Sequence, residues 1–513
     1  MTLTSALSKA VQGLNMAARG TDVISANIAN AQTPGYVRRQ IETSERIVSG
    51  ESVGLNPIAV TRNVSTETAE AVRRAQVTFQ QQEVIKDGLQ NIVYAIGDVN
   101  SEFSLSARFD TFNTSLRNLA ETPENGSLQD QTIIEAKIFA TNINDTASAM
   151  QEIRQDADAQ IKREVDNVNE LLHRLKSVNG EIITISGTGD VSGLQDEQER
   201  LINEISEAFP ISTTYNYDGS VRISSQTGIT LLDINVTELE FTASSFIPPH
   251  VVYAYEGEDP GAPYDDSLSG LVIGGLDITP TADKIQSLDG GRIGGLFKLR
   301  DEETVIIQRQ IDSIAVRLIE GFRNNDSSLT DANTNGTTDG IPDGVPDQDS
   351  IFTSAYPGGV YTTVEDMIGV ANTFQINSNI DPDQGGDKRR IRDGAEATVF
   401  GPEGSATNIR AWINELSTLT TFDSSTDLTQ SQTIMSAVRE FVSLASLKNQ
   451  NEQNSYDYES GKLNTLMDER DALQGVNLDN EMNDLVFLQK LYSANAVLMQ
   501  RAGEMLQMIL DLR

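Results

Sequence analysis

The sequence predicts a mainly α-helical protein with inserted β domains, whose core is a long helical bundle built from both halves of the chain. Long segments with helical periodicity occur on both sides of two central regions in which that periodicity is lost. Each end of the chain also carries a heptad pattern of apolar residues. Such a pattern is typical of coiled coils, so we expect the terminal helices to form one.

The N-terminal helix is predicted from apolar or small residues at alternating spacings of four and three, with Thr21 as the one polar position. The pattern stops near Asn30, and Pro34 and Gly35 then follow, which are residues that end helices. The larger apolar members of this stripe, which we expect at an interface, are Leu3, Leu7, Leu14, Ile24 and Ile28.

A second heptad stripe lies at the C-terminal end, where Asn477 or Asp479 is a suitable N-cap for its helix. Its expected interface residues are Leu485, Leu488, Tyr492, Met499, Leu506 and Ile509. A helix with such a stripe cannot bury it alone. We therefore expect residues 1–60 and 472–513 to form a terminal coiled-coil assembly domain, in which the helices pack on each other and on neighbouring copies. The alternative is that each helix packs on the body of its own chain.

Between the two ends, the sequence alternates between helical and irregular segments. The predicted discontinuous α-helical core comprises residues 61–210, 290–325 and 409–471. Residues 211–289 form a β-rich inserted domain, because β-branched and polar residues alternate there around turn formers such as Asp218-Gly219. Residues 326–408 are rich in Gly and Asp and form a second insert of irregular and β structure.

The composition excludes several classes of partner. The chain has 513 residues, 38 basic and 75 acidic, with a formal net charge of −37. Nucleic acids and anionic membranes are bound by clustered basic surfaces, so we expect neither as a partner. No cysteine is present, and no apolar run reaches the ~18 residues that span a bilayer. The N-terminus does not resemble a signal peptide, although export without cleavage would leave the same sequence.

The residues needed for catalysis are scarce. The two histidines are His173, expected on the solvent face of a helix, and His250, expected in a loop. Neither has metal-ligand spacing, and no nucleotide-binding or nucleophile motif occurs. The glycines between Gly290 and Gly295 are better explained as a sharp backbone turn, and Trp412 as a core residue. We expect a protein that is not an enzyme and holds no cofactor.

One segment has the spacing of a calcium loop. Asp331, Asn333, Asn335 and Asp339 place oxygen donors at alternate positions, with Gly336 where such a loop bends. The twelfth position, where a bidentate Glu would complete the shell, is Pro342. A polar, turn-rich surface loop is therefore the favoured interpretation, and calcium binding the alternative.

Both ends also carry motifs that resemble a known family. An Asn-Ile-Ala-Asn segment followed by Thr-Pro-Gly-Tyr resembles the N-terminal signature of the rod, hook and hook-associated proteins of bacterial flagella. A Gly-Val-Asn-Leu-Asp segment is similar to their C-terminal signature. The residues that carry the signatures are Asn27, Asn30, Pro34, Gly35 and Tyr36, and Asn477, Leu478 and Asp479. The interior segment 288–301 resembles the one with which the FlgK family closes its β insert and re-enters the helical core.

This resemblance implies a structural subunit of the bacterial flagellum, at the junction between hook and filament. Such a subunit assembles in a ring and joins the hook protein below to the second junction protein above. It implies export through the flagellar type III channel without a cleaved signal peptide, an export chaperone as a partner, and an extracellular location. The alternatives are another axial subunit (hook or second junction protein), a secreted calcium-stabilised adhesin, or an enzyme carried in the β insert, which would need a water-excluded pocket with perturbed carboxylates.

Overall fold

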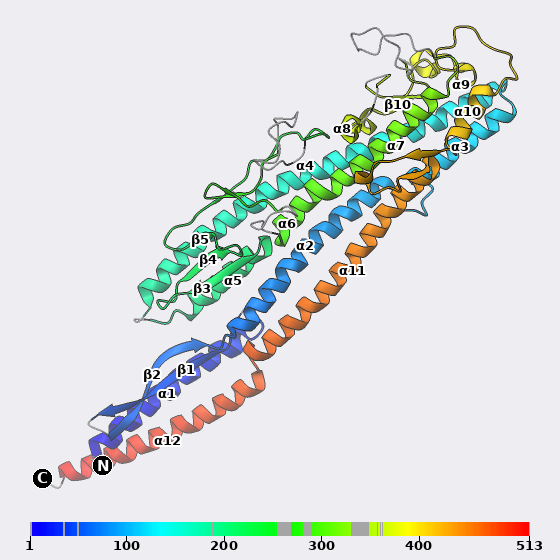
Figure 1. The fold of residues 1–513 in the computed structure, drawn as a ribbon. Helices are drawn as coiled ribbons and strands as arrows, with labels where there is room; N and C mark the ends of the chain where they lie inside the picture. Colours follow the sequence, from blue (N-terminus) through cyan, green and yellow to red (C-terminus); the bar gives the residue numbers. More distant parts are fainter. Residues whose placement is uncertain are drawn as a thin grey trace.

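The structure, a computed structural model, describes residues 3–33, 36–48, 51–186, 189–251, 253, 268–280, 289–329, 348–355, 358–359, 361 and 363–511. The fold is mainly α-helical with small antiparallel sheets, which confirms the predicted fold class (Figure 1). We call residues 3–62 and 475–511 the terminal unit and residues 63–474 the body. The terminal unit lies at one end of the body, and both chain termini lie near its far tip (Figure 1).

The terminal unit contains two helices and one hairpin. They are α1 (Leu3–Asn30), α12 (Leu478–Asp511), β1 (Arg39–Val48) and β2 (Glu51–Arg62). The strands pair antiparallel from Arg39 opposite Arg62 and lie against α1. The hairpin was not predicted from the sequence, although Ile41 and Thr43 belong to the β-branched residues that favour strands.

The body is a bundle of long helices from both halves of the chain. They are α2 (Thr66–Ile96), α3 (Leu105–Glu121), α4 (Gly126–Ile185), α5 (Ser192–Ala208), α6 (Gly291–Lys298), α7 (Thr304–Asn324) and α11 (Ile434–Gln474). A π-helical turn, Leu299–Glu303, joins α6 to α7. Side chains start several of these helices, because the oxygens of Ser65, Asn125 and Thr433 accept hydrogen bonds from first-turn backbone N–H groups.

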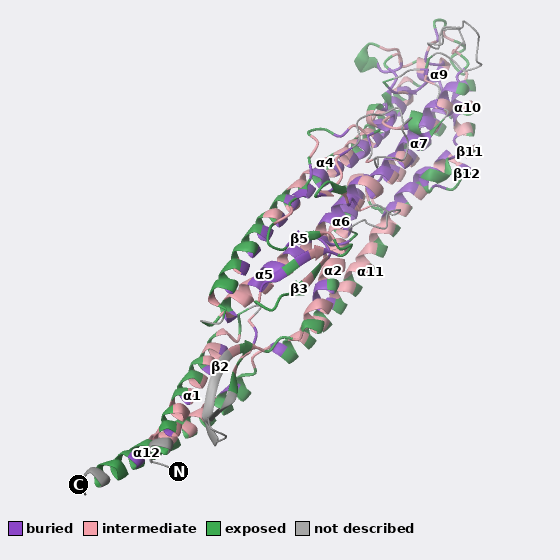
Figure 2. Ribbon diagram, turned by 60° about the vertical axis from the view of Figure 1, so that its left-hand side comes forward, coloured by how far each residue is buried: buried purple, intermediate pink, exposed green. Residues whose placement is uncertain are grey.

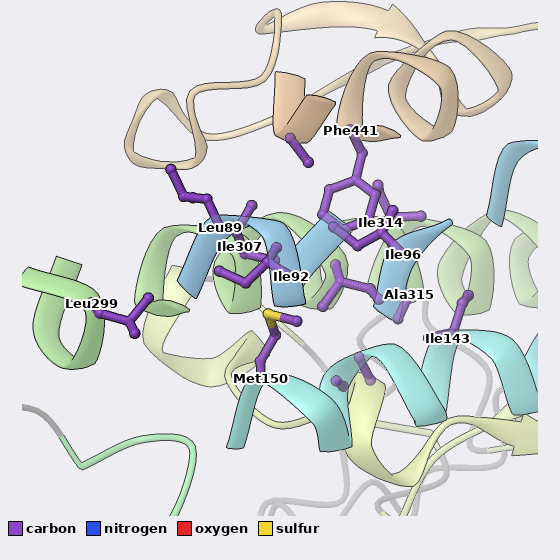
Figure 3. Packing of buried hydrophobic residues seen from close by; sticks show 14 of the residues in the cluster. Leu89, Ile92, Ile96, Ile143, Met150, Leu299, Ile307, Ile314, Ala315 and Phe441 are labelled. Atoms are coloured by element: carbon purple, nitrogen blue, oxygen red, sulfur yellow. The ribbon is translucent and has the colours of Figure 1, made fainter. Parts of the chain in front are cut away.

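Apolar residues from four of these helices meet in one continuous core. Leu89, Ile92 and Ile96 of α2 pack with Met150 of α4, Ile307 and Ile314 of α7 and Phe441 of α11 (Figure 3). Nearer α3, six phenylalanine rings from several elements form one connected cluster, with Phe112 5.4 Å from Phe352 between ring centroids. Trp412 is fully buried, as predicted, and its indole N–H donates to the Phe322 carbonyl at 3.1 Å. The long bundle thus owes its stability to burial of these side chains.

Small sheets and short helices fill the inserts. The strands are β3 (Ile211–Tyr215), β4 (Val221–Ser225), β5 (Thr230–Leu232), β6 (Leu239–Glu240), β7 (Val272–Ile273), β8 (Leu276–Asp277), β9 (Phe352–Thr353), β10 (Gln375–Ile376), β11 (Leu419–Thr421) and β12 (Ser431–Thr433). The short helices are α8 (Val364–Met367), α9 (Arg390–Asp393), α10 (Thr407–Glu415) and the 3₁₀ turns Ala371–Thr373, Pro382–Gln384 and Ser424–Thr426. Gly291 has φ +66°, and a Cβ there would lie 2.4 Å from the Ala208 carbonyl oxygen, which confirms the predicted sharp turn.

One predicted helical stretch is interrupted. Within residues 409–471 the strands β11 and β12 form a hairpin between α10 and α11. Thr420 and Thr421 are β-branched, and Asp427 adopts a left-handed φ of 56°, so this stretch favours strand and turn over helix.

Candidate assembly interface

The helices α1 and α12 lie side by side and run antiparallel (Figure 1). Three pairs of positions, each seven residues apart, show the register. Gly13 faces Asn495, Gly20 faces Leu488, and Asn27 faces Glu481. A constant step of seven along both helices is what a heptad-based pairing requires. The two ends of the chain therefore pack on each other, and the structure does not fold either helix back onto the body.

Small residues let the two helices approach closely. A Cβ added at Gly13 would lie 2.4 Å from the Asn495 side chain, and one added at Gly20 would lie 2.6 Å from Leu488 Cδ1. Ala10 and Ala17 are buried on the same helix, and Ala502 is buried on α12. The contact is narrow, so it covers only a strip of each helix.

The rest of the apolar surface of α12 stays exposed in a single copy. Phe487 is 65% exposed and Leu498 59% (Figure 2, where α12 is largely exposed and the buried residues are concentrated in the body). The exposed large apolar residues of this helix are Leu478, Met482, Val486, Phe487, Tyr492, Val497, Leu498, Met499, Met505, Leu506 and Met508. A helix that exposes this many large apolar side chains is typical of an interaction site.

The predicted interface residues divide between these two surfaces. In α1, Ile24 is buried and Leu7, Leu14 and Ile28 are partly buried. In α12, Leu485 and Leu488 are partly buried, whereas Tyr492, Met499 and Leu506 are exposed. The side chains of Leu3 and Ile509 lie outside the described part of the chain. The single copy thus covers part of each predicted stripe and leaves the outer part of the α12 stripe free.

A hydrogen-bonded cluster locks the inner end of the helix pair. Asn27 is buried, and its amide nitrogen donates to the Arg39 carbonyl and to Glu481 Oε2, each at 3.0 Å. Its amide oxygen accepts from Tyr36 Oη at 2.9 Å and from the Arg39 backbone N–H at 3.0 Å. Burial raises the pKa of Tyr36, so its hydroxyl stays protonated as a donor at neutral pH. All four hydrogen-bonding positions of the Asn27 amide are used.

Glu481 connects the two ends of the chain electrostatically. Its side chain is fully buried and accepts from Arg38 Nε at 2.6 Å as well as from Asn27. Arg38 also donates to Asp484 at 3.1 Å. A buried carboxylate needs such charged and polar partners to offset its desolvation. Neither Arg38 nor Glu481 was predicted as an interface residue. The seven-residue spacing of Ala6, Gly13, Gly20 and Asn27 indicates the inner face of α1, but it does not indicate these two partners.

The remaining signature residues occupy the helix ends. Asn477 caps α12, because its side-chain oxygen accepts from the backbone N–H groups of Asp479 and Asn480, which decides between the two predicted caps. Leu478 and Asp479 are exposed at the first turn. Asn30 donates to the Ala26 carbonyl at the end of α1. Pro34 and Gly35 lie outside the described residues.

Other predicted sites contribute no chemistry to the described structure. The calcium-loop residues Asp331, Asn333, Asn335 and Asp339 lie outside it, and no cluster of metal-ligating side chains occurs within it. His173 is on an exposed helix face, as predicted, with Nε2 2.8 Å from Glu238 Oε1. No helix in the described ranges has the length and hydropathy to cross a membrane.

One carboxylate in the described body is strongly perturbed. Burial raises the pKa of Asp312 to about 7. Both of its oxygens are occupied, because they accept from the backbone N–H groups of Gly369 and Ala371, each at 2.8 Å, and from Gln308. This arrangement fastens the second insert to α7, so Asp312 has a structural role.

Comparisons with known proteins match three parts of the chain. Residues 89–340 match the model of the "Flagellar hook-associated protein FlgK helical domain". Residues 7–36 match that of the "Flagella basal body rod protein", and residues 473–512 that of the "Flagellar basal body rod FlgEFG protein C-terminal". The two shorter matches cover most of α1 and all of α12, which form the helix pair described above.

Individual relatives carry the same family name. The chain is 21% identical over 340 residues to "Flagellar hook-associated protein 1" of Escherichia coli K12, covering 64% of this chain and 58% of that protein. It is 23% identical over 229 residues to the protein of the same name from Bacillus subtilis, covering 40% of this chain and 43% of that protein. The chain thus spans less than two thirds of the length of these curated relatives.

A solved structure, the flagellar hook junction protein FlgK from Burkholderia pseudomallei, aligns with a TM-score of 0.42 and 16% identity over 56% of this chain and 47% of that one. The match to the helical-domain model, the flagellar models at both ends and the hook-associated relatives agree with one another. The chain belongs to the FlgK family of flagellar hook-associated proteins.

Proposed function

We propose that this chain is a structural subunit of the bacterial flagellum at the junction between hook and filament. In this role it joins the hook protein to the second junction protein, assembles in a ring, and performs no catalysis. The proposal includes an extracellular location, export through the flagellar type III channel without a cleaved signal peptide, and an export chaperone as a partner in the cell.

The observation that carries the proposal is the uncovered apolar face of α12. The family is built of axial subunits, and this face lies on the C-terminal segment that the chain shares with rod and hook proteins. Exposed apolar side chains such as Phe487, Leu498 and Met505 become covered when neighbouring copies supply their own helices. Residues 1–60 and 472–513 then act as the assembly domain, and the core and the inserts 211–289 and 326–408 are carried outside it.

The proposal is tested in a strain that lacks the gene. We expect complete hooks without filaments, with filament subunits released into the medium, and restoration of filaments by the full-length chain. The triple variant Phe487→Ser, Leu498→Ser, Met505→Ser should be secreted but fail to restore filaments. The matched control Ile134→Ser, Ile138→Ser removes exposed apolar residues from α4 and should restore them. Normal filaments in the deletion strain would contradict the proposal.

A further inference from the structure

The terminal unit is held to the body by few contacts besides the two chain crossings, at residues 62–63 and 474–475. Within the described residues, every ion pair between the two parts ends on one carboxylate, Asp196 of α5. Arg39 Nη2 donates to Asp196 Oδ2 at 2.7 Å, and Arg62 Nε lies 2.8 Å from Asp196 Oδ1. Each oxygen of the carboxylate therefore faces one arginine.

The two arginines stand at the same place in the hairpin. Arg39 begins β1 and Arg62 ends β2, and they are directly paired in the strand register. The Asp196 carboxylate thus forms ion pairs with both strands at the end of the hairpin nearest the body. The side chains are 18%, 9% and 20% exposed for Arg39, Arg62 and Asp196, so solvent screens their attraction less than that of a surface pair.

Further contacts connect Arg39 to the two terminal helices. The backbone of Arg39 is bonded to Asn27 through both its N–H and its carbonyl group, and its guanidinium lies 4.9 Å from the Tyr36 ring centroid. Asn27 in turn bonds Glu481 of α12. A continuous chain of contacts therefore runs from α5 of the body to both α1 and α12.

The surroundings of this contact resemble a hinge. A cavity of about 450 Å³ lies between the two parts and is lined by Tyr36, Arg62, Val72, Met467 and Gln474, among others. The hydrogen bonds Arg38 N–H to Gln474 carbonyl and Asn63 to Leu473 carbonyl lie at the chain crossings themselves. Bonds at a crossing keep the strands together but give little resistance to rotation about it.

We propose that Asp196 is a latch that fixes the orientation of the terminal unit relative to the body, and that loss of its charge frees a hinge at the chain crossings. The neighbouring Glu199 does not replace it, because Glu199 is engaged by Arg73 at 2.6 Å and by the Tyr215 hydroxyl at 2.8 Å. The latch is a property of the single copy and does not rest on the proposed flagellar function.

Single-molecule fluorescence energy transfer tests the latch at picomolar concentration, where copies do not assemble. The chain has no cysteine, so Ser177→Cys on α4 and Ser493→Cys on α12, both exposed positions, label specifically. The parent should give one narrow population of transfer efficiency. Asp196→Lys places a positive charge beside both arginines and should strongly broaden or shift this distribution of transfer efficiency. Asp196→Asn, which only removes the negative charge, should change the distribution less. Raising NaCl to about 1 M, where the screening length is roughly 3 Å, should broaden the parent's distribution.

The matched control is Glu197→Gln, which removes a carboxylate one residue away whose ion pairs, among the described residues, are with Arg174 and Arg200 inside the body. It should leave the parent distribution unchanged. Circular dichroism checks that the body of each variant is folded, and Arg39→Gln with Arg62→Gln, which leaves α5 intact, should reproduce the broadening. A parent-like distribution in folded Asp196→Lys, or in the double arginine variant, would overturn the proposal. Neither result would alter the outcome of the deletion strain, so the two proposals fail separately.

Discussion

The body and the terminal unit of this protein solve the problem of burying apolar surface in opposite ways. The body encloses Phe112, Phe139 and Ile314 completely, with no exposed area. The terminal unit has a narrow helix contact and leaves side chains such as Phe487 and Leu498 more than half exposed. The body can therefore be stable as a single copy, whereas the terminal unit leaves apolar surface that only contact with another molecule would bury.

The distribution of charge sharpens this contrast. Residues 1–62 and 475–513 hold nine basic and nine acidic residues, whereas residues 63–474 hold 29 basic and 66 acidic residues. The whole formal charge of −37 thus belongs to the body. Like charges on the bodies keep copies apart in solution, and the terminal unit, which has no formal net charge, is the part that can approach another copy without net repulsion.

The largest effect should come from removing α12. A chain that ends at Asn477 should lose assembly completely, because the exposed apolar face and the partner of α1 are both gone. The melting midpoint of the body should stay within about 2 °C of the full chain's, since the body core has no contribution from this helix. Sedimentation velocity measures assembly, and calorimetry measures the melting midpoint of the body.

A matched variant keeps the helix and changes only its polar side. Gln489→Ala, Gln500→Ala and Gln507→Ala alter exposed polar positions of α12 and should preserve assembly. If the truncated chain still assembled, the assignment of assembly to the terminal unit and not to the body would be wrong.

The reverse experiment damages the body alone. Phe112→Ala removes a fully buried ring in contact with Phe139, Phe322 and Phe352 and should lower the free energy of unfolding of the body by about 3–5 kcal/mol. Assembly of the folded variant at low temperature should be unchanged. Urea unfolding measures the loss, and Phe103→Ala, at an exposed ring near Arg108, should cost less than about 1 kcal/mol. Equal losses in the two variants would contradict the assigned core.

The sequence was informative where structure follows local pattern. The fold class, the end of α1 near Asn30, the cap at Asn477 and the burial of Trp412 all depend on periodicity, breakers or residue type within a short window. The hairpin β1–β2 and the interruption at β11–β12 were missed because the helical patterns on either side outweighed short runs of β-branched residues.

The interface was predictable only in part, for a different reason. The heptad stripes indicated which helices associate, but the contact of Asn27 with Glu481 joins residues 454 positions apart, and no local pattern contains that pairing. The predicted stripe also included Tyr492 and Met499, which the single copy leaves exposed. Periodicity gives the apolar face of a helix, and it does not say how much of that face one partner covers.

A smaller and more local effect is expected at Asn27. Asn27→Ala removes four hydrogen bonds and leaves buried partners unpaired, including one oxygen of Glu481. The terminal unit should lose about 2–4 kcal/mol of stability, while the body is unaffected. Amide hydrogen exchange should rise in α1 and α12 only. Asn30→Ala removes a bond to the Ala26 carbonyl and an exposed bond from the Thr33 hydroxyl, and it should change the opening free energy of these amides by less than about 1 kcal/mol.

The smallest effect tests how closely the terminal helices pack. Gly20→Ala gains about 1 kcal/mol of helix propensity, but its Cβ would lie 2.6 Å from Leu488 Cδ1, and overpacking costs about 1–3 kcal/mol. We expect a net loss of about 1 kcal/mol from the terminal unit, which Leu488→Ala in the same chain should relieve. Gly180→Ala, on an exposed part of α4 with nothing within 4 Å of the added Cβ, should instead stabilise the body. A double-mutant cycle over Gly20 and Leu488 that gives no coupling energy would show that the two helices are farther apart in solution than the structure places them.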